Sequence, residues 1–320
     1  MARIFYLGNS ESEVEYSNIM KVIPRGQRVT SYDPNRPLAS QISDAEIVIE
    51  DGGTTISKEI IDQAKEARFF QRYGVGMNHM DVGYALSKGI LVANTPGGGS
   101  ALAEQAILLM LSLARQTPLW EERIKERDVG GLVGSELKGK VLGIVGIGSS
   151  GSELAKVAKA FGMKIKAIDV VPVGAERQSE LGLDSFGGLD RLDDLLVQSD
   201  YISIHVPLNE TTRGMIGRRE FAKMKKGAVL VNVARGPIID EDSLLESLLS
   251  GRIGGAGLDV FGEEPIDPGH PILRMKNVVF SPHIAGSTRE TFERRAEMVG
   301  ENLDRYIHGR PILNAITRAD

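Results

Sequence analysis

Three segments of the sequence carry side chains suited to acid–base chemistry on a small carboxylic acid. Each follows an apolar run that predicts a buried strand, and together they supply Arg235, Glu264 and His283. Histidine can exchange a proton, a carboxylate beside it favours the protonated imidazole, and the planar guanidinium of arginine matches a carboxylate. Taken singly, Arg235 is more typical of a surface ion pair, Glu264 of a solvated acid and His283 of a turn cap. Because ligands bind at the carboxyl ends of parallel strands, we expect the three to form one catalytic set that reduces a 2-oxo acid.

A glycine-rich loop precedes these segments. The stretch Gly146-Ile147-Gly148-Ser149-Ser150-Gly151 lies between an apolar strand pattern at 140–145 and a helical pattern at 152–161. In this arrangement the glycines permit a tight turn, close approach of a pyrophosphate and packing of the helix on the strand. Asp169, at the end of the next strand, could accept hydrogen bonds from the ribose hydroxyls of NAD and would repel the 2′-phosphate of NADP. The motif alone is also typical of an ordinary turn, but with strand, helix and Asp169 it predicts a dinucleotide site.

Short apolar runs alternate with helical segments along most of the chain. The first series predicts helices at 11–21, 58–66 and 81–87 and strands at 3–7, 28–32, 46–50, 68–73 and 90–93. The second series predicts strands at 141–146, 164–169, 201–206, 228–233, 256–260 and 278–281. Such alternation is typical of βαβ units, so the expected fold class is α/β with two doubly wound parallel-sheet domains.

The boundary between the domains is expected near three consecutive glycines. The turn-rich stretch 94–100 opens a long helix that extends to about Gln116. Ser287-Thr288-Arg289-Glu290 has capping-box spacing and begins another helix, which extends to about His308. No further strand accompanies this last helix, so we expect it to return to the first domain. The prediction is a discontinuous substrate-binding domain at 1–98 and 287–320, with an NAD-binding Rossmann domain at 99–286.

Composition excludes several classes of protein. Of 320 residues, 42% are hydrophobic and 25% charged, as in globular proteins rather than disordered chains. The net charge of −5 disfavours a nucleic-acid binder, and the absence of cysteine excludes disulfides and thiolate metal sites. The most apolar stretch, 101–114, contains Glu104 and is shorter than the ~20 residues of a membrane span. We expect no membrane association, no metal and a cytoplasmic location.

The motifs and their order resemble the D-isomer-specific 2-hydroxyacid dehydrogenase family, which includes glyoxylate and hydroxypyruvate reductases and phosphoglycerate dehydrogenases. The resemblance covers nearly the whole chain. Besides the glycine loop, the matching stretches are Arg72-Tyr73-Gly74-Val75-Gly76, Asn94-Thr95-Pro96-Gly97, Ala103-Glu104, His205-Val206-Pro207-Leu208 with Thr212, Asn232-Val233-Ala234-Arg235-Gly236, Asp259-Val260-Phe261 with Glu264-Pro265, and Pro282-His283.

The resemblance implies an NAD(H)-dependent homodimer that interconverts a small D-2-hydroxy acid and its 2-oxo acid. It implies a flavodoxin-like substrate domain into which the Rossmann domain is inserted. Its catalytic set would be Arg235, Glu264 and His283, and the main-chain amides of Val75 and Gly76 would bind substrate together with Arg235 and His283. Asp259 would contact the nicotinamide amide. The full implied cofactor site comprises Gly146, Gly148, Ser149, Ser150, Gly151, Asp169, His205, Val206, Pro207, Thr212, Val233, Ala234, Arg235, Asp259, His283, Ala285 and Gly286.

Some positions depart from the family pattern. Family members commonly carry arginine where this chain has Ser149, so one charged contact to the pyrophosphate is missing here. His79 replaces a residue of the usual Asp-Asn pair, and a structural role for it is favoured over substrate contact. Trp120 precedes the position of the family's usual tryptophan and is expected to be a packing residue on a helix.

Three alternatives remain at this point. Phosphoglycerate dehydrogenases commonly carry a cation after the third strand, whereas this chain has Glu50-Asp51-Gly52-Gly53-Thr54, which favours small, singly charged substrates. Formate dehydrogenases share the fold but lack an acidic partner such as Glu264. The C-terminal-binding transcriptional corepressors keep the catalytic set while acting as NAD-dependent scaffolds, although no partner-binding extension is evident here.

Overall fold

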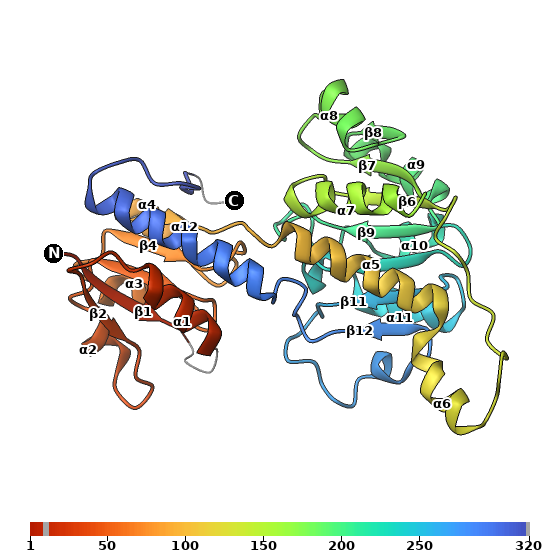
Figure 1. The fold of residues 1–320 in the computed structure, drawn as a ribbon, viewed down its shortest axis with the longest axis horizontal. Coiled ribbons are helices and arrows are strands. Elements are labelled where there is room, and N and C mark those ends of the chain that lie inside the picture. The colour runs from red at the N-terminus through yellow and green to blue at the C-terminus, as the bar shows by residue number, and fades with distance from the viewer. Residues whose placement is uncertain (9–12, 318–320) are drawn as a thin grey trace. The chain divides into compact units, whose positions relative to one another are not determined.

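The chain forms two compact α/β units (Figure 1). The computed structural model describes residues 1–8 and 13–317. Unit 1 comprises Met1–Gly97 with Ser287–Asp320, and unit 2 comprises Gly98–Gly286. Each unit has its own sheet, and every pairing between strands in both sheets is parallel. The predicted fold class is therefore confirmed. The first two residues of the helix expected at 11–21 lie outside the described residues.

Unit 1 has a five-stranded sheet in the order β2-β1-β3-β4-β5, the order of flavodoxin-like folds. Its strands are β1 (Arg3–Leu7), β2 (Arg28–Ser31), β3 (Ile47–Glu50), β4 (Phe69–Arg72) and β5 (Leu91–Ala93). Its helices are α1 (Glu13–Val22), α2 (Leu38–Ile42), α3 (Lys58–Gln63), α4 (Val82–Ser87) and α12 (Arg289–Ile307).

Alternate residues of these strands face two different cores. Phe5 and Leu7 pack with buried residues of α2 to α4, whereas Ile4 and Tyr6 pack with buried residues of α1 and α12. Helices therefore cover both faces, as a parallel sheet requires.

Unit 2 has a seven-stranded sheet in the order β12-β11-β10-β9-β6-β7-β8. Its strands are β6 (Val141–Val145), β7 (Lys164–Ile168), β8 (Ser185–Gly187), β9 (Tyr201–Ile204), β10 (Val229–Asn232), β11 (Gly255–Leu258) and β12 (Val278–Phe280). Its α-helices are α5 (Gly99–Arg115), α6 (Trp120–Lys125), α7 (Ser149–Ala160), α8 (Ala175–Glu180), α9 (Leu192–Gln198), α10 (Arg218–Lys223) and α11 (Glu241–Leu249). Four 3-10 turns lie at Thr117–Leu119, Leu189–Arg191, Gly236–Ile238 and Pro271–Arg274.

The strand order of unit 2 reverses direction between β6 and β9. Successive strands run outward from β6 through β7 to β8, and then outward from β9 to β12 on the other side. One core lies under α5 and α7, and the other under α9 to α11. In open α/β sheets such a reversal creates a crevice at the carboxyl ends of the strands, and ligands bind there.

Helix α12 is held within unit 1 by a buried polar side chain. Asn302 donates to the side-chain oxygen of Gln71 on β4 at 2.8 Å, and its own oxygen accepts from the amide of Leu313 at 2.7 Å. The cap of this helix differs from the prediction, because Thr288 rather than Ser287 accepts the first-turn bond, from Thr291.

The sequence predicted no range for β8 or for the helices α2, α6 and α8 to α11. The edge strand β8 has three residues and α2 has five, too few to produce a recognisable apolar period. None of the described helices is long and apolar enough to cross a membrane.

Candidate functional site

The imidazole of His283 is paired with the carboxylate of Glu264. Nδ1 of His283 lies 2.7 Å from Oε2 of Glu264, and Oε1 of Glu264 accepts from the amide of Phe261 at 2.9 Å. Burial by itself would raise the pKa of the Glu264 carboxyl, but the bonds from His283 and Phe261 and the nearby charge of Arg235 outweigh it and lower that pKa. The carboxylate is therefore ionised at neutral pH and can accept a hydrogen bond from Nδ1 of His283.

The loop that carries His283 is held by the buried carboxylate of Asp259, which directly follows β11. Oδ1 accepts from the hydroxyl of Ser281 at 2.5 Å and from the amide of Ile284 at 3.0 Å, while Oδ2 accepts from the amide of Ala285 at 2.9 Å. His283 itself has a φ of 55°, a left-handed conformation that costs a residue with a side chain roughly 1–2 kcal/mol. Asp259 thus offsets strain at the proposed proton donor.

Arg235 stands in the loop after β10, which is also fixed by a buried polar side chain. Asn232 donates to the carbonyl of Arg235 at 2.9 Å and accepts from the amide of Ala234 at 3.0 Å. A β-carbon on Gly236 would overlap the carbonyl oxygen of Phe261, so glycine lets this loop lie against the one that leads to Glu264. Unit 2 therefore brings the three predicted catalytic residues together at the carboxyl ends of β10, β11 and β12.

The glycine loop lies between β6 and the start of α7. A β-carbon on Gly146 would lie 2.6 Å from the carbonyl oxygen of His205, and one on Gly151 would overlap the carbonyl oxygen of Gly146. On Gly148, in contrast, a β-carbon would meet no atom within 4 Å. Two glycines are thus needed for packing, and the middle one borders open space where the backbone can be approached. This arrangement fits a pyrophosphate at the N-terminus of α7, close to Ser149 and Ser150.

Asp169 follows β7 and points toward the glycine loop. Its Oδ2 accepts from the amide of Ile147 at 2.7 Å and its Oδ1 from the amide of Val171 at 2.9 Å. A carboxylate has about four acceptor positions, so two bonds leave capacity for ribose hydroxyls.

His205 connects the end of β9 to the glycine loop. Its ring nitrogens lie 2.9 Å from the hydroxyls of Ser150 and Ser203. Burial lowers the pKa of His205 to about 4, so the ring is neutral at pH 7. This places His205 beside the predicted cofactor site, as a bridge between β9 and the loop.

The other predicted cofactor residues of unit 2 follow the ends of β9, β10 and β12. Thr212 is buried, and its hydroxyl donates to the carbonyl of Pro207 at 2.7 Å, which closes the turn after β9. The remaining ones lie beside this turn or in the loops of Arg235 and His283, and they are Val206, Val233, Ala234, Ala285 and Gly286. Their contacts with cofactor stay predictions.

Val75 and Gly76 lie in unit 1, in the loop after β4. His79, in the same loop, is bound through Nε2 to Oε2 of the buried Glu50 at 2.8 Å. That contact favours the structural role expected for His79. Trp120 differs from expectation, since it begins α6 but is 47% exposed and is not a packing residue within the chain.

The sequence did not predict which side chains hold the loops that carry Arg235, His283 and the Val75–Gly76 amides. Asn232, Ser281 and Glu50 contact those loops, and Asn232 and Glu50 are fully or almost fully buried. The available signal was a polar residue at or just beyond the end of an apolar strand. Among the described residues no group of three or more His, Asp or Glu side chains could hold a metal ion.

The fold and these loops define a dinucleotide-binding α/β protein with an acid–base pair at the strand ends. Residues 107–285 match the model of the D-isomer specific 2-hydroxyacid dehydrogenase NAD-binding domain. The chain belongs to this family, as the sequence motifs predicted, and unit 2 contains its NAD-binding domain.

Individual relatives carry several different names. A hydroxypyruvate reductase of Thermotoga maritima is 41% identical over 79% of this chain and 82% of its own length. A D-3-phosphoglycerate dehydrogenase of Archaeoglobus fulgidus is 38% identical over 87% of this chain, which spans only 53% of that relative. The structure of a glyoxylate reductase from Paecilomyes thermophila superposes with a TM-score of 0.85 at 30% identity, covering 99% of this chain and 98% of that one. The chain thus spans about half the length of the phosphoglycerate dehydrogenases it matches.

The glycine loop predicts a contrast between two substitutions to alanine. Gly148→Ala should leave the melting temperature unchanged but weaken NADH binding about tenfold, because the new methyl group borders the space for the pyrophosphate. Gly151→Ala should instead lower stability by about 1–3 kcal/mol through overlap with the main chain. Thermal melts and titration of NADH fluorescence measure both effects. Wild-type NADH affinity in Gly148→Ala would contradict the placement of the pyrophosphate.

Proposed function

We propose that this chain is an NAD(H)-dependent oxidoreductase that interconverts a small D-2-hydroxy acid and its 2-oxo acid. The observation that carries the proposal is the His283–Glu264 pair beside Arg235, at the same edge of the sheet as the glycine loop. Membership of the 2-hydroxyacid dehydrogenase family supports the same reaction.

The proton is exchanged at Nε2 of His283. Its Nδ1 is committed to Glu264, so Nε2 is the nitrogen that can face the substrate oxygen. In the reductive direction protonated His283 donates to the carbonyl oxygen as it becomes a hydroxyl, and in oxidation neutral His283 removes that proton. Bound NADH supplies the hydride in reduction, and NAD⁺ accepts it in oxidation.

Arg235 would bind the substrate carboxylate and polarise the adjacent carbonyl. A guanidinium can bind a carboxylate with two parallel hydrogen bonds, which orients the carbonyl carbon as well as holding it. The positive charge also stabilises the negative charge that develops on the carbonyl oxygen. The main-chain amides of Val75 and Gly76 would provide a second set of donors for the carboxylate.

The preferred substrates should be small and carry a single negative charge, as in glyoxylate or hydroxypyruvate. Asp51 follows β3, where a cation for a second anion would be expected. Arg72 and His79, the cations on the neighbouring segment, are both bound to Glu50. Relatives named D-3-phosphoglycerate dehydrogenase make phosphoglycerate the second candidate substrate.

We also propose that the chain forms a homodimer. Segment 108–133 carries a series of exposed apolar side chains, including Trp120, Ile124 at 75% exposure, Val129 at 96% and Val133 at 85%. A soluble monomer seldom exposes so many apolar groups on one short segment, and a second copy of the chain is the partner that the family resemblance implies. A cytoplasmic location stays a prediction.

The catalytic assignment predicts different effects of two substitutions. His283→Ala should lower kcat by about 10²–10⁴-fold, the usual size of a general acid–base contribution. In Glu264→Gln the carboxylate that pairs with Nδ1 of His283 is lost, so kcat should also fall, but by less than in His283→Ala, because the imidazole itself remains. Steady-state rates between pH 5 and 9 measure both. Near wild-type activity of His283→Ala on every substrate would contradict the assignment.

The substrate assignment predicts a ratio. The kcat/KM for hydroxypyruvate should exceed that for its phosphorylated form, because the additional phosphate is expected to meet Asp51, while Arg72 and His79 are both bound to Glu50. Parallel assays of NADH oxidation with both compounds give this ratio. A preference of more than about tenfold for the phosphate ester, or ~1.4 kcal/mol, would make phosphoglycerate the substrate class.

The dimer is expected to have twice the chain mass of 34.7 kDa. Light scattering after size exclusion measures this mass directly. Ile124→Glu should shift the species toward the monomer, whereas the matched variant Lys125→Glu, one residue along the same helix, should not. A wild-type monomer at micromolar concentration would contradict the proposal.

A further inference from the structure

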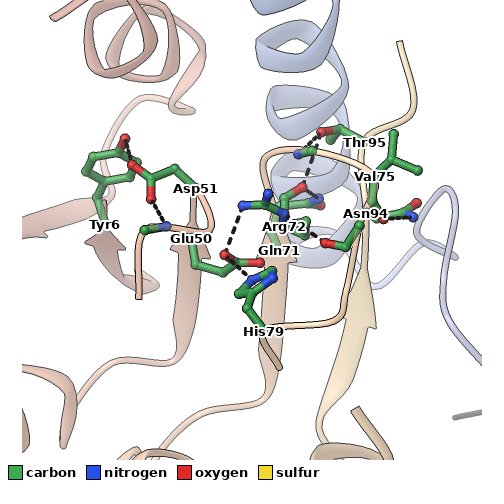
Figure 2. A network of polar contacts seen from close by, with 12 residues as sticks. Tyr6, Glu50, Asp51, Gln71, Arg72, Val75, His79, Asn94 and Thr95 are labelled. Atoms are coloured by element: carbon green, nitrogen blue, oxygen red, sulfur yellow. Dashed lines mark hydrogen bonds and ion pairs between the residues drawn. The ribbon is translucent and has the colours of Figure 1, made fainter. Parts of the chain in front are cut away.

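A guanidinium in unit 1 is held in a fixed place by a buried ion pair. Arg72, the last residue of β4, has Nη1 3.1 Å from Oε2 of Glu50, the last residue of β3. Glu50 is 1% exposed, and its Oε2 also lies 2.8 Å from Nε2 of His79 (Figure 2). Removing a partner from a buried carboxylate is costly, so this contact restricts the position of Arg72.

Two glycines provide the space that the guanidinium occupies. A β-carbon on Gly52 would lie 2.5 Å from both Nη atoms of Arg72, and one on Gly74 would lie 2.9 Å from Nη2. Their φ angles of 94° and 152° are in the range that favours glycine. The backbone at Gly52 and at Gly74 therefore leaves room for the guanidinium of Arg72 only because both residues lack a β-carbon.

A second donor of Arg72, its Nε, is directed at the loop that is proposed to bind substrate. Nε donates to the carbonyl of Gly76 at 3.2 Å. The two preceding carbonyls are also held, that of Val75 by the side chain of Asn94 at 2.9 Å and that of Gly74 by the amide of Thr95 at 2.8 Å. Figure 2 shows Arg72, Asn94 and Thr95 grouped around this loop.

Fixing three successive carbonyls also fixes three successive amides. In a trans peptide the N–H points opposite to the C=O of the same unit, so the amides of Val75, Gly76 and Met77 are turned away from the groups that hold the carbonyls. Within the part of the chain that the structure describes, none of these three amides donates a hydrogen bond. Successive unpaired amides in a loop are a typical binding site for an anionic oxygen.

We propose that Arg72 is a positioning residue for the substrate carboxylate. Anchored by Glu50, it holds the Gly76 carbonyl and thereby directs the amide of Met77 toward the carboxylate. Asn94 holds the Val75 carbonyl and directs the amide of Gly76 in the same way. The proposed role of Arg72 acts through the backbone, because the two guanidinium contacts that the structure defines are with Glu50 and with the carbonyl of Gly76. The inference rests on the proposed function for the identity of the ligand, and adds Met77 as a third amide donor.

Arg72→Lys separates the two contacts of this side chain. A lysine ammonium can keep the ion pair with Glu50 but lacks the forked donors needed to reach Gly76 as well. We expect the dissociation constant of oxamate, a 2-oxo acid analogue with one carboxylate, to rise about tenfold at saturating NADH, measured by calorimetry. The KM for the 2-oxo acid should rise similarly with a smaller change in kcat, and NADH affinity should stay at the wild-type value.

Controls separate this role from general stability. Arg28→Lys alters an exposed arginine of the same unit, 4.0 Å from Asp44, and should leave oxamate binding unchanged. Asn94→Ala releases the Val75 carbonyl by an independent change and should also weaken the binding of oxamate. This variant tests the inference if Arg72→Lys does not fold. Oxamate binding within twofold of wild type in the folded Arg72→Lys, or no binding by the wild type, would overturn the inference. Wild-type binding without turnover of any 2-oxo acid would instead count against the proposed function alone.

Discussion

The buried carboxylate of Asp259 is the interaction on which the acid–base site depends. It accepts three hydrogen bonds from Ser281, Ile284 and Ala285, which surround His283 on both sides in the chain. Those bonds compensate the left-handed conformation of His283, and that conformation is the one in which Nδ1 meets Glu264. Without these hydrogen bonds the loop would relax, and the strained His283 would not be held 2.7 Å from the carboxylate of Glu264.

Polar side chains at other strand ends also hold nearby loops. Asn232 holds the loop of Arg235, Asp169 contacts the glycine loop, and Glu50 anchors Arg72 beneath the loop at 74–76. In each case a polar side chain at or just after the carboxyl end of a strand holds the loop after that strand or after the strand paired with it, because an unpaired polar group in that position would be costly. Parallel topology places these ends at one edge of each sheet, so rigid strands position several loops at once. The side chains proposed for catalysis are then oriented before any ligand binds, as preorganised catalysis would require.

The sequence predicted the parts of this arrangement that depend on local pattern. Apolar runs predicted eleven of the strands to within two residues at either end. The glycine motif, read with its flanking strand and helix, predicted NAD, and the motifs in their combination and order predicted the family. It did not predict β8, whose three residues form an edge strand, or the exposure of Trp120. The sequence also did not predict that Glu50 is buried. Its partners Arg72 and His79 come from other segments, and only folding brings them together. The roles of Arg235, Glu264 and His283 in catalysis stay predictions, although their proximity is now defined.

In the proposed reaction His283 exchanges a proton with the hydroxyl of a D-2-hydroxy acid while NAD⁺ takes the hydride. The most direct measurement is NADH formation by the wild-type chain from a panel of 2-hydroxy acids, each supplied as its separate D and L enantiomers. At least one D acid should support sustained NADH formation, and its L enantiomer should not. NADH formation from L enantiomers alone, or from none of the acids by protein shown to bind NADH, would contradict the proposed reaction.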